Sequence, residues 1–304
     1  MAAPSSNLVT SVGRVLLDTS LPLPARFRAL FTLRNLGGHE AVEWIGRGFV
    51  DKSALLKHEL AYCLGQMGDR SALPVLSAVL MDGSQEPMVR HEAGEALGAI
   101  GDPEVLELLK EYSRDSVIEV AETCQLAIQR IEWFQRNPDA PDDNPFLSVD
   151  PAPPSEERDV PSLRAILLND NLPLFERYRA MFALRNIGGN EAVLALTDGL
   201  QCGSPLFRHE IGYVLGQMQH KAAVPGLAAA LDRLEENPMV RHECAEALGS
   251  IALEDCLKAL RTHIGDQEQV VRESCEVALD MYEYENSGDF QYANGLGQVQ
   301  EMAS

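Results

Sequence analysis

The sequence predicts an all-α protein, an α-solenoid built from stacked helical hairpins. Three observations support this fold class. Aromatic residues make up only 6% of the chain whereas alanine and leucine are plentiful, a composition that suits packed helices better than a β-sandwich. Apolar residues recur at helical spacing. The same pattern also returns at intervals of about 30 residues, which is typical of repeat proteins whose units bury one face on a neighbour.

A long duplication divides the chain into two halves related by an offset of 151 residues. Residues 26–39 return at 177–190, and residues 57–68 return at 208–219. The strongest match is between residues 87–100 and 238–251, with 11 of 14 positions identical. Because no gap is needed from about residue 26 to 102, the two halves are expected to share one internal organisation.

Each half contains four shorter repeats, marked by apolar anchor residues. The anchors have identical spacing in both halves: Leu33, Leu64, Leu97 and Ile128, then Leu184, Leu215, Leu248 and Leu279. Around Leu64, apolar residues at i, i+3, i+4 and i+7 predict a helix. Gly-Asp or Asp-Pro punctuation follows the anchors, and the apolar stretch 72–80 predicts a second helix. These units resemble HEAT repeats, so we expect eight HEAT-like hairpins in two four-repeat halves that face each other.

The domain organisation follows from these repeats. Residues 1–136 are expected to form the N-terminal four-repeat half and residues 162–284 the C-terminal half. Residues 137–161 hold seven prolines in 25 positions and are acidic, which predicts an extended, semi-rigid linker. The polar, glycine-rich residues 285–304 are expected to be a flexible tail.

The chain is strongly acidic. It has 46 Asp and Glu against 25 Lys and Arg, for a net charge of −21, which argues against a nucleic-acid partner and favours a cationic one. No apolar run approaches the ~18 residues of a membrane span, so no membrane association is expected. The first residues lack the basic and apolar regions of a secretory signal. We expect a cytoplasmic protein that acts as a monomer.

The six cysteines form no Cys-x-x-Cys pair, and several fall within apolar helical patterns. This argues against structural zinc and against a disulfide framework. Buried free thiols are the better interpretation.

Four His-Glu pairs stand out against the repeat pattern. They begin six residues before the anchors of the two central repeats of each half, at His58-Glu59, His91-Glu92, His209-Glu210 and His242-Glu243. The outer repeats carry an aromatic-Arg or a Glu-hydroxyl pair at that place, so the repeat fold itself does not require His-Glu. The remaining histidines provide a comparison, since none has a twin in the other half. We expect no function for His39, His220 or His263.

Side chains from successive repeats can meet on one ion, because neighbouring helices pack ~8–10 Å apart. Adjacent residues on a helix point ~100° apart, so one member of a pair can bind a metal while the other faces a neighbouring ion, water or substrate. Imidazole and carboxylate ligands together suit Fe, Mn or Zn. Two histidines and one carboxylate per ion are the open set of non-haem iron oxygenases. A polar interface between the halves is the alternative explanation. The four glutamates would favour a polycationic substrate such as an amine.

The architecture, the duplication, the acidic linker and the four His-Glu pairs resemble the deoxyhypusine hydroxylase family. The resemblance covers roughly residues 8 to 284, and its specific motifs are the doubled Met-Val-Arg-His-Glu and Tyr-x-Leu-Gly-Gln-Met. It implies a non-haem di-iron monooxygenase that hydroxylates the aminobutyl chain of the deoxyhypusine residue in translation initiation factor five-A. Two iron ions, dioxygen as co-substrate and an external reductant are implied with it.

The resemblance also implies roles for the paired residues. One iron would be held by His58, His91 and Glu92, and the other by His209, His242 and Glu243. Glu59 and Glu210 would bind the amines of the substrate. Gly65 and Gly216 would either let the substrate chain approach closely or cap a helix.

Three other functions are compatible with the pattern. A HEAT scaffold without catalysis would fold and bind a partner even without the four histidines. A hydrolase would hold Mn or Zn at the same ligands and activate water. A lyase of the phycobilin-attachment type has related repeats, but its chemistry has no need for four His-Glu pairs.

Overall fold

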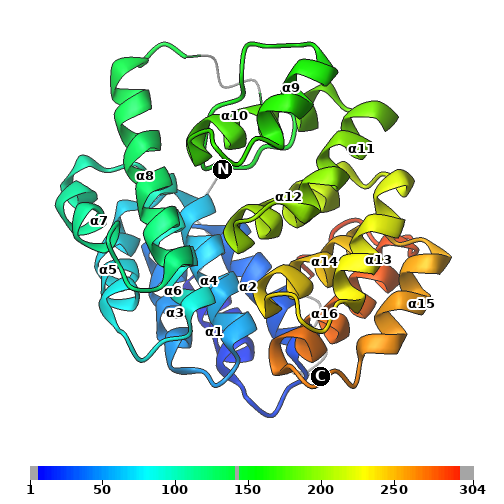
Figure 1. The fold of residues 1–304 in the computed structure, drawn as a ribbon. Helices are drawn as coiled ribbons and strands as arrows, with labels where there is room; N and C mark the ends of the chain where they lie inside the picture. The colour runs from blue at the N-terminus through cyan, green and yellow to red at the C-terminus, as the bar shows by residue number, and fades with distance from the viewer. Residues whose placement is uncertain (1–5, 141–143, 295–304) are drawn as a thin grey trace. The chain divides into compact units, whose positions relative to one another are not determined.

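The computed structural model describes residues 6–140 and 144–294, and these residues form sixteen α-helices and five short 3-10 helices with no strand among them (Figure 1). The all-helical prediction is therefore confirmed for the described part of the chain. The chain divides into two compact units: unit 1 comprises residues 1–131 and 289–304, and unit 2 comprises residues 132–288. Each unit is described by itself.

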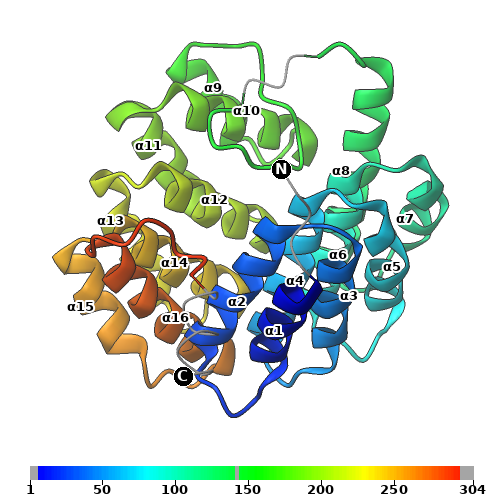
Figure 2. The ribbon, with the colours of Figure 1, turned by 180° about the vertical axis from the view of Figure 1, so that it is seen from behind.

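Unit 1 contains four helix pairs, and α1 packs on both α2 and α3 (Figure 2). Its helices are α1 (Ser6–Leu17), α2 (Leu23–Leu36), α3 (His39–Gly46), α4 (Ala54–Met67), α5 (Leu73–Met81), α6 (Pro87–Ile100), α7 (Leu106–Tyr112) and α8 (Ile118–Arg136), the last of which continues into unit 2. The second helices of adjacent pairs also pack together, most extensively α4 with α6. The predicted second helix at 72–80 is α5, displaced by one residue.

Unit 2 repeats this order. Its helices are α9 (Val160–Leu167), α10 (Leu174–Ile187), α11 (Gly189–Asp198), α12 (Pro205–Met218), α13 (Val224–Asp232), α14 (Pro238–Ile251), α15 (Glu254–His263) and α16 (Gln269–Glu285). Helix α14 packs between α12 and α16. The starts of α10, α12, α14 and α16 follow those of α2, α4, α6 and α8 by the offset of the sequence duplication, which is therefore reproduced in the helix boundaries.

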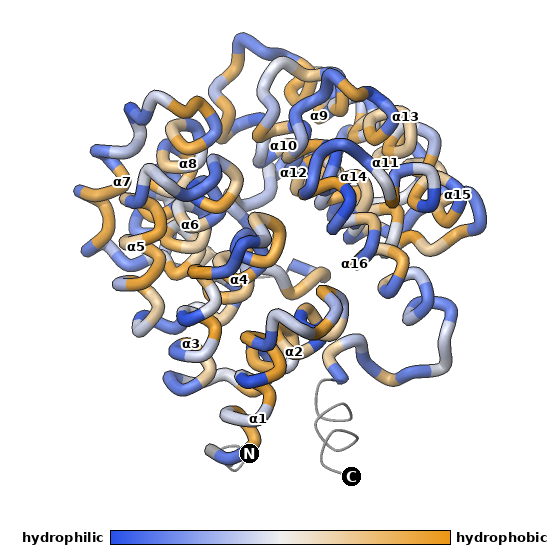
Figure 3. Tube along the Cα trace, turned by 90° about the horizontal axis from the view of Figure 1, so that it is seen from below, coloured by the Kyte–Doolittle hydropathy of each residue, from blue (hydrophilic) through white to orange (hydrophobic). Residues whose placement is uncertain are grey.

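The anchors of the first three repeats of each half lie in the cores of the two units, whereas Ile128 and Leu279 are only partly buried. Leu33, Leu64 and Leu97 in unit 1 and their counterparts Leu184, Leu215 and Leu248 in unit 2 are fully buried. Figure 3 shows hydrophobic and hydrophilic stretches alternating along the helices, as expected for helices with one buried face. Burial of these repeating apolar faces holds successive helix pairs together.

Two glycines allow the second helices of neighbouring pairs to approach closely. A Cβ atom on Gly65 would lie 2.8 Å from Ala96 Cα, and one on Gly216 would lie 3.1 Å from Ala247 Cα. Neither glycine caps its helix. The C-terminal cap of α4 is Gly68, in the left-handed conformation, and that of α12 is Gln219. Tight helix packing is therefore the observed role of Gly65 and Gly216, and the cap interpretation is wrong, whereas the substrate contact stays a prediction.

Part of the proline-rich linker folds onto unit 2 around the buried guanidinium of Arg185. Asp150 accepts two hydrogen bonds from Arg185, of 2.9 and 2.6 Å. The guanidinium also lies 4.7 Å from the Phe146 ring centroid and 4.8 Å from that of Phe182. Asn144 accepts a further bond of 3.0 Å from Arg185. These contacts attach residues 144–150 to α10.

Among the described residues of the expected flexible tail, only the first is helical, since α16 ends at Glu285. Residues 289–294 belong to unit 1, where the ring of Tyr292 lies edge-on to Phe31 at 5.9 Å. The guanidinium carbon of Arg28 lies 4.6 Å from the centroid of the same tyrosine ring. Residues 295–304, the rest of this expected tail, are outside the described part of the structure.

None of the helices in the described ranges has the length and apolar character that crossing a membrane would require. All six cysteines are buried and free, as predicted.

Candidate metal centre

Each His-Glu pair lies near the start of its helix, where a basic residue immediately before the pair fixes the chain. In α6, Arg90 Nε donates to the Leu80 carbonyl at the end of α5, and Nη2 pairs with Asp115 at 2.5 Å. In α14, Arg241 makes the same contacts with the Leu231 carbonyl and with Asp266. These buried ion pairs hold the first turn of each helix, and therefore its His-Glu pair, in place.

The basic residue before the first pair of each half has an acidic partner as well. Lys57 Nζ lies 2.6 Å from a carboxylate oxygen of Glu86, and Arg208 Nη2 lies 2.5 Å from one of Glu236. The hydroxyls of Ser53 and Ser204 cap α4 and α12. The two helices that carry the first pairs therefore begin in the same way.

The unit 1 cluster, defined as His58, His91 and Glu92, brings together residues from α4 and α6. Nε2 of His58 lies 3.3 Å from Glu92 Oε2, and Nε2 of His91 lies 4.0 Å from the same oxygen. The two imidazole centroids are 5.5 Å apart. All three side chains are buried, and each offers a ligand atom within 4.8 Å of the others.

The unit 2 cluster, defined as His209, His242 and Glu243, repeats on α12 and α14 the histidine–glutamate contact between helices and the spacing of the two imidazoles. Nε2 of His209 lies 3.3 Å from Glu243 Oε2, and the imidazole centroids are 5.3 Å apart. Glu246 lies close to this cluster. The residues of unit 2 that offer ligand atoms within 4.8 Å of one another are His242, Glu243 and Glu246. Each of the two duplicated helix pairs therefore collects two imidazoles and at least one carboxylate.

Glu59 directly follows His58 on α4, and Glu210 directly follows His209 on α12. Both are buried, with 7% and 2% of their surface exposed. Neither belongs to the groups of potential ligand atoms found within a unit, whereas Glu92 and Glu243 do. The structure thus distinguishes the glutamates of the first pairs from those of the second pairs by their place relative to the other potential ligand atoms of their unit.

Thiolate ligands are disfavoured near these clusters. Burial, followed by the negative charge of Glu59, raises the pKa of the Cys63 thiol well above its usual value. Burial likewise raises the pKa of Cys244, and Glu243 adds to this effect. None of the groups of potential ligand atoms in the described ranges includes a cysteine, so the donors brought together are imidazole and carboxylate.

Two imidazoles and a carboxylate suit a borderline divalent metal. Carboxylate and water alone are typical of Mg²⁺ or Ca²⁺ sites, and thiolates of structural zinc, so this donor set points to iron, manganese or zinc. The ligand atoms of His58, His91 and Glu92, and those of His242, Glu243 and Glu246, lie within 4.8 Å of one another and can converge on one ion of that size after small side-chain adjustments. The residues present therefore fit the metal that the sequence resemblance implies.

The three histidines without a twin lie outside both clusters. His39 is 70% exposed and pairs with Glu43 one turn later on α3. The His220 side chain accepts a backbone hydrogen bond as the cap of a short 3-10 helix. His263 is buried between Asp232 and Asp266, with Nε2 and Nδ1 at 2.7 and 3.2 Å from their carboxylates. Each therefore makes local contacts within its own part of the fold.

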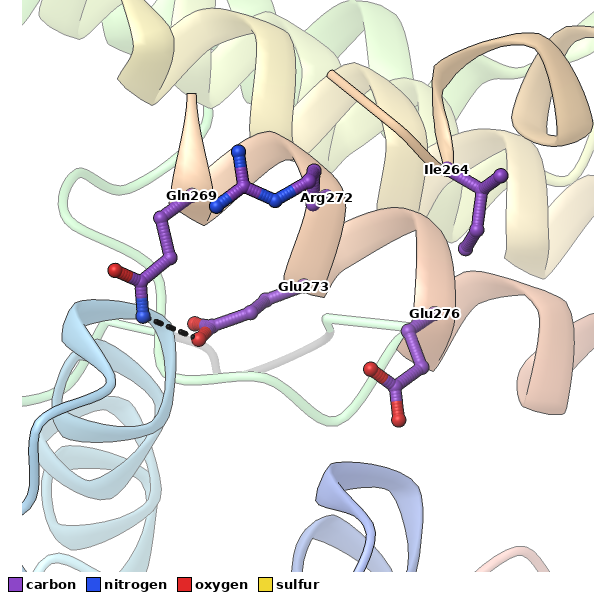
Figure 4. A pocket seen from close by; sticks show the side chains of 5 residues that line it. All are labelled: Ile264, Gln269, Arg272, Glu273 and Glu276. Atoms are coloured by element: carbon purple, nitrogen blue, oxygen red, sulfur yellow. Dashed lines mark hydrogen bonds between the residues drawn. The ribbon is translucent and has the colours of Figure 1, made fainter. Parts of the chain in front are cut away.

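A surface pocket on unit 2 is separate from the cluster residues. Its lining consists of Ile264, Gln269, Arg272, Glu273 and Glu276, and Gln269 donates a 2.7 Å hydrogen bond to Glu273 (Figure 4). Glu273 occupies the place that a histidine occupies in the central repeats. None of these lining residues is a histidine, so the fourth repeat does not extend the metal-ligand set.

Sequence reasoning did not identify the buried basic residues before the pairs or the glutamate one turn after His242. The first had a visible signal, since Lys57, Arg90, Arg208 and Arg241 all directly precede a His-Glu pair. The glutamate also had a visible signal, because Glu95 stands four residues after His91 and Glu246 stands four residues after His242.

Comparison with known proteins agrees with this architecture and assigns the family. A model of HEAT repeats matches residues 47–129 and 193–280, and one of PBS lyase HEAT-like repeats matches residues 176–202. The chain is therefore a HEAT-repeat protein with a histidine–carboxylate cluster in each unit.

Full-length relatives give the particular family. The deoxyhypusine hydroxylase of Xenopus laevis is 79% identical over 99% of this chain and 100% of its own length. The human deoxyhypusine hydroxylase is 69% identical over 97% and 98% of the two chains. A structure of the human enzyme in complex with glycerol is 70% identical, with a TM-score of 0.91, and the match covers 92% of this chain and 97% of that one. The chain belongs to the deoxyhypusine hydroxylase family.

Proposed function

We propose that this protein is a deoxyhypusine monooxygenase that hydroxylates the deoxyhypusine residue of translation initiation factor five-A. The observation that carries the proposal is the repetition of one histidine–carboxylate cluster, with the same 3.3 Å His–Glu separation, in both units. Membership of the deoxyhypusine hydroxylase family supports the reaction.

Two iron ions are the proposed cofactors, one for each cluster. His58, His91 and Glu92 would hold one ion, and His209, His242 and Glu243 the other. Iron with this ligand set activates dioxygen, so that one oxygen atom enters a C–H bond and the other leaves as water, with two electrons from an external reductant. Burial of the ligands excludes bulk water from their surroundings and strengthens their interaction with a cation.

Glu59 and Glu210 are proposed to bind the substrate. Deoxyhypusine carries two cationic nitrogens, and a buried carboxylate accepts charge-assisted hydrogen bonds from an ammonium group. Because each glutamate directly follows a proposed ligand on its helix, it is fixed relative to that ligand by the helix backbone. Binding both nitrogens would orient the aminobutyl chain for reaction at one carbon.

The charge of the whole chain supports a cationic protein substrate. A net charge of −21 attracts a basic loop and speeds its encounter with the protein. The cytoplasm is the proposed location, where thiols such as these remain reduced.

The test combines metal analysis with a product assay. The purified full chain should contain about two irons per chain. With dioxygen and a reductant, it should add the mass of one oxygen atom to a factor that carries deoxyhypusine. A His58→Ala variant should lose this activity, whereas His39→Ala should keep it, because His39 is an exposed histidine outside the clusters.

Two results would replace the proposal. Tightly bound zinc or manganese, with no oxygen-dependent product after iron is supplied, would indicate a hydrolase at the same ligands. Absence of both bound metal and product after iron is added back would indicate a scaffold.

A further inference from the structure

His242 has a second carboxylate beside it that the proposed ligand set does not use. Glu246 lies one helical turn later on α14, and its Oε1 is 3.7 Å from His242 Nδ1. The imidazole is fully buried, and the glutamate side chain is only 16% exposed. This places a carboxylate at the δ edge of the ring.

Glu246 is itself held from the next helix pair. Ser274 on α16 donates a 3.4 Å hydrogen bond from Oγ to Glu246 Oε1. Ser274 is fully buried and stands five residues before the anchor Leu279, at the place where the central repeats carry the glutamate of their His-Glu pair. The serine of this outer repeat therefore contacts the carboxylate that faces His242.

The δ-edge contact leaves the other ring nitrogen for the metal. In the unit 1 cluster, Nε2 of both His58 and His91 faces the carboxylate of Glu92. His209 also presents Nε2 to Glu243. Because the two nitrogens lie on different edges of an imidazole, a carboxylate at Nδ1 fixes both the tautomer and the direction of Nε2.

We propose that Glu246 is a positioning residue that holds His242 through Nδ1–H, and that Ser274 in turn holds Glu246, so that His242 Nε2 is presented to the metal. This inference rests on the proposed metal-binding function and adds two residues to it. The duplication extends it to unit 1, where Glu95 and the buried Thr123 stand at the corresponding positions.

Metal affinity tests the role directly. The iron-free full-length chain is titrated anaerobically with Fe(II) in competition with a chromophoric chelator. Glu246→Ala should weaken one of the two sites about 10- to 100-fold, as is usual when the group behind a ligating histidine is removed. Glu246→Gln should retain most of the affinity, because the amide oxygen can take the place of the carboxylate oxygen as an acceptor for Nδ1–H.

Variants of the serine separate positioning from a general structural effect. Ser274→Ala should lower the Fe(II) affinity of the same site by less than Glu246→Ala does. Ser274→Thr should keep the wild-type affinity, since threonine occupies this position in the other half. Glu254→Ala is the matched control, because Glu254 is 81% exposed on a neighbouring helix of unit 2. Circular dichroism melting verifies that each variant is folded.

Two outcomes overturn only this inference: unchanged Fe(II) affinity in a folded Glu246→Ala variant, or a Glu246→Gln variant that loses the ion as completely as His242→Ala. The second result would make Glu246 a direct ligand. A wild-type chain that takes up no iron at all would overturn the proposed function together with the inference.

Discussion

His58 and Glu92 are 34 positions apart in the sequence, yet Nε2 of the histidine lies 3.3 Å from Oε2 of the glutamate. The contact forms because α4 and α6 pack side by side in unit 1 and carry their His-Glu pairs in equivalent positions near the helix start. The equivalent contact between His209 and Glu243 has the same length. Duplication has thus preserved the distance between two side chains as well as their identities.

Removal of one ligand should empty a cluster. His91→Ala deletes an imidazole that is fully buried beside Glu92, and it should lower the iron content to at most about one ion per chain, because the two remaining ligands bind weakly. Iron per chain after desalting is the measurement. His39→Ala should contain as much iron as wild type, and equal iron loss in both variants would contradict the assignment.

Glu59 should affect substrate binding and leave the metal in place. Glu59→Gln removes a buried negative charge, and it should weaken binding of a deoxyhypusine-containing peptide by about 2 kcal/mol, or roughly 30-fold. Iron content should stay at the wild-type level. Peptide titration of the iron-loaded protein checks the first expectation. Loss of iron equal to that of His58→Ala would show that Glu59 is a ligand.

Acid should weaken unit 2 through Asp266. Hydrogen bonds from Arg241 lower the pKa of this carboxyl to about 2. Since the folded-state pKa lies below the unfolded value near 4, Asp266 stabilises the fold above pH ~4, and this contribution is lost as the pH falls towards 2. The contribution amounts to at most about 2 kcal/mol.

An Asp266→Asn variant tests this pH dependence. Its free energy of unfolding, measured by urea denaturation between pH 2 and 7, should fall less steeply than that of wild type below pH ~4. At pH 7 the variant should be less stable, because the buried Arg241 loses its charged partner. If the free energy of unfolding of the variant fell as steeply as that of wild type below pH ~4, carboxyl groups other than Asp266 would dominate the loss of stability in acid.

Close helix packing at Gly65 should not tolerate a methyl group. Gly65→Ala would place a Cβ atom 2.8 Å from the backbone of Ala96, and the resulting shift of α4 against α6 should cost about 1–3 kcal/mol. Gly83→Ala is the control, since a Cβ atom there meets no atom within 4 Å. Thermal denaturation of the two variants should show a lower Tm only for Gly65→Ala.

The contact between Arg185 and the linker should contribute to stability. Arg185→Lys keeps the charge but cannot reproduce the two hydrogen bonds to Asp150 or the stacking on Phe146 and Phe182. A loss of about 2–4 kcal/mol in the free energy of unfolding is expected. Chemical denaturation measures it, with the 71% exposed Arg136 changed to lysine as control. Equal stability of the two variants would refute the expectation.

The sequence was most informative where the repeats multiply a signal. One His-Glu pair on a helix says little, but pairs at matched positions in successive repeats predicted that their side chains can meet on one ion. The resemblance to the deoxyhypusine hydroxylase family implied the particular sets, and the structure brings His58, His91 and Glu92 together. The helices were predictable for the same reason, since the four anchors of one half recur at the same intervals in the other half.

Other features depend on contacts that no periodic pattern encodes. Ser274 lies beside Glu246 only because α16 packs on α14, and a lone serine in an outer repeat carries no signal of that contact. Composition predicted an extended linker, but it could not show that Asp150 forms an ion pair with the guanidinium of Arg185. The packing role of Gly65 was not predicted because its neighbour across the helix interface, Ala96, belongs to another repeat.

The docking of residues 144–150 onto Arg185 also changes where unit 2 should be cut for study in isolation. A fragment that starts at residue 162, where the repeats resume, would keep a buried guanidinium and remove its carboxylate. Replacing the segment with a glycine–serine spacer of the same length would do the same. Residues 144–150 therefore act as a cover over a buried side chain of unit 2, and a self-sufficient fragment must begin before Asn144.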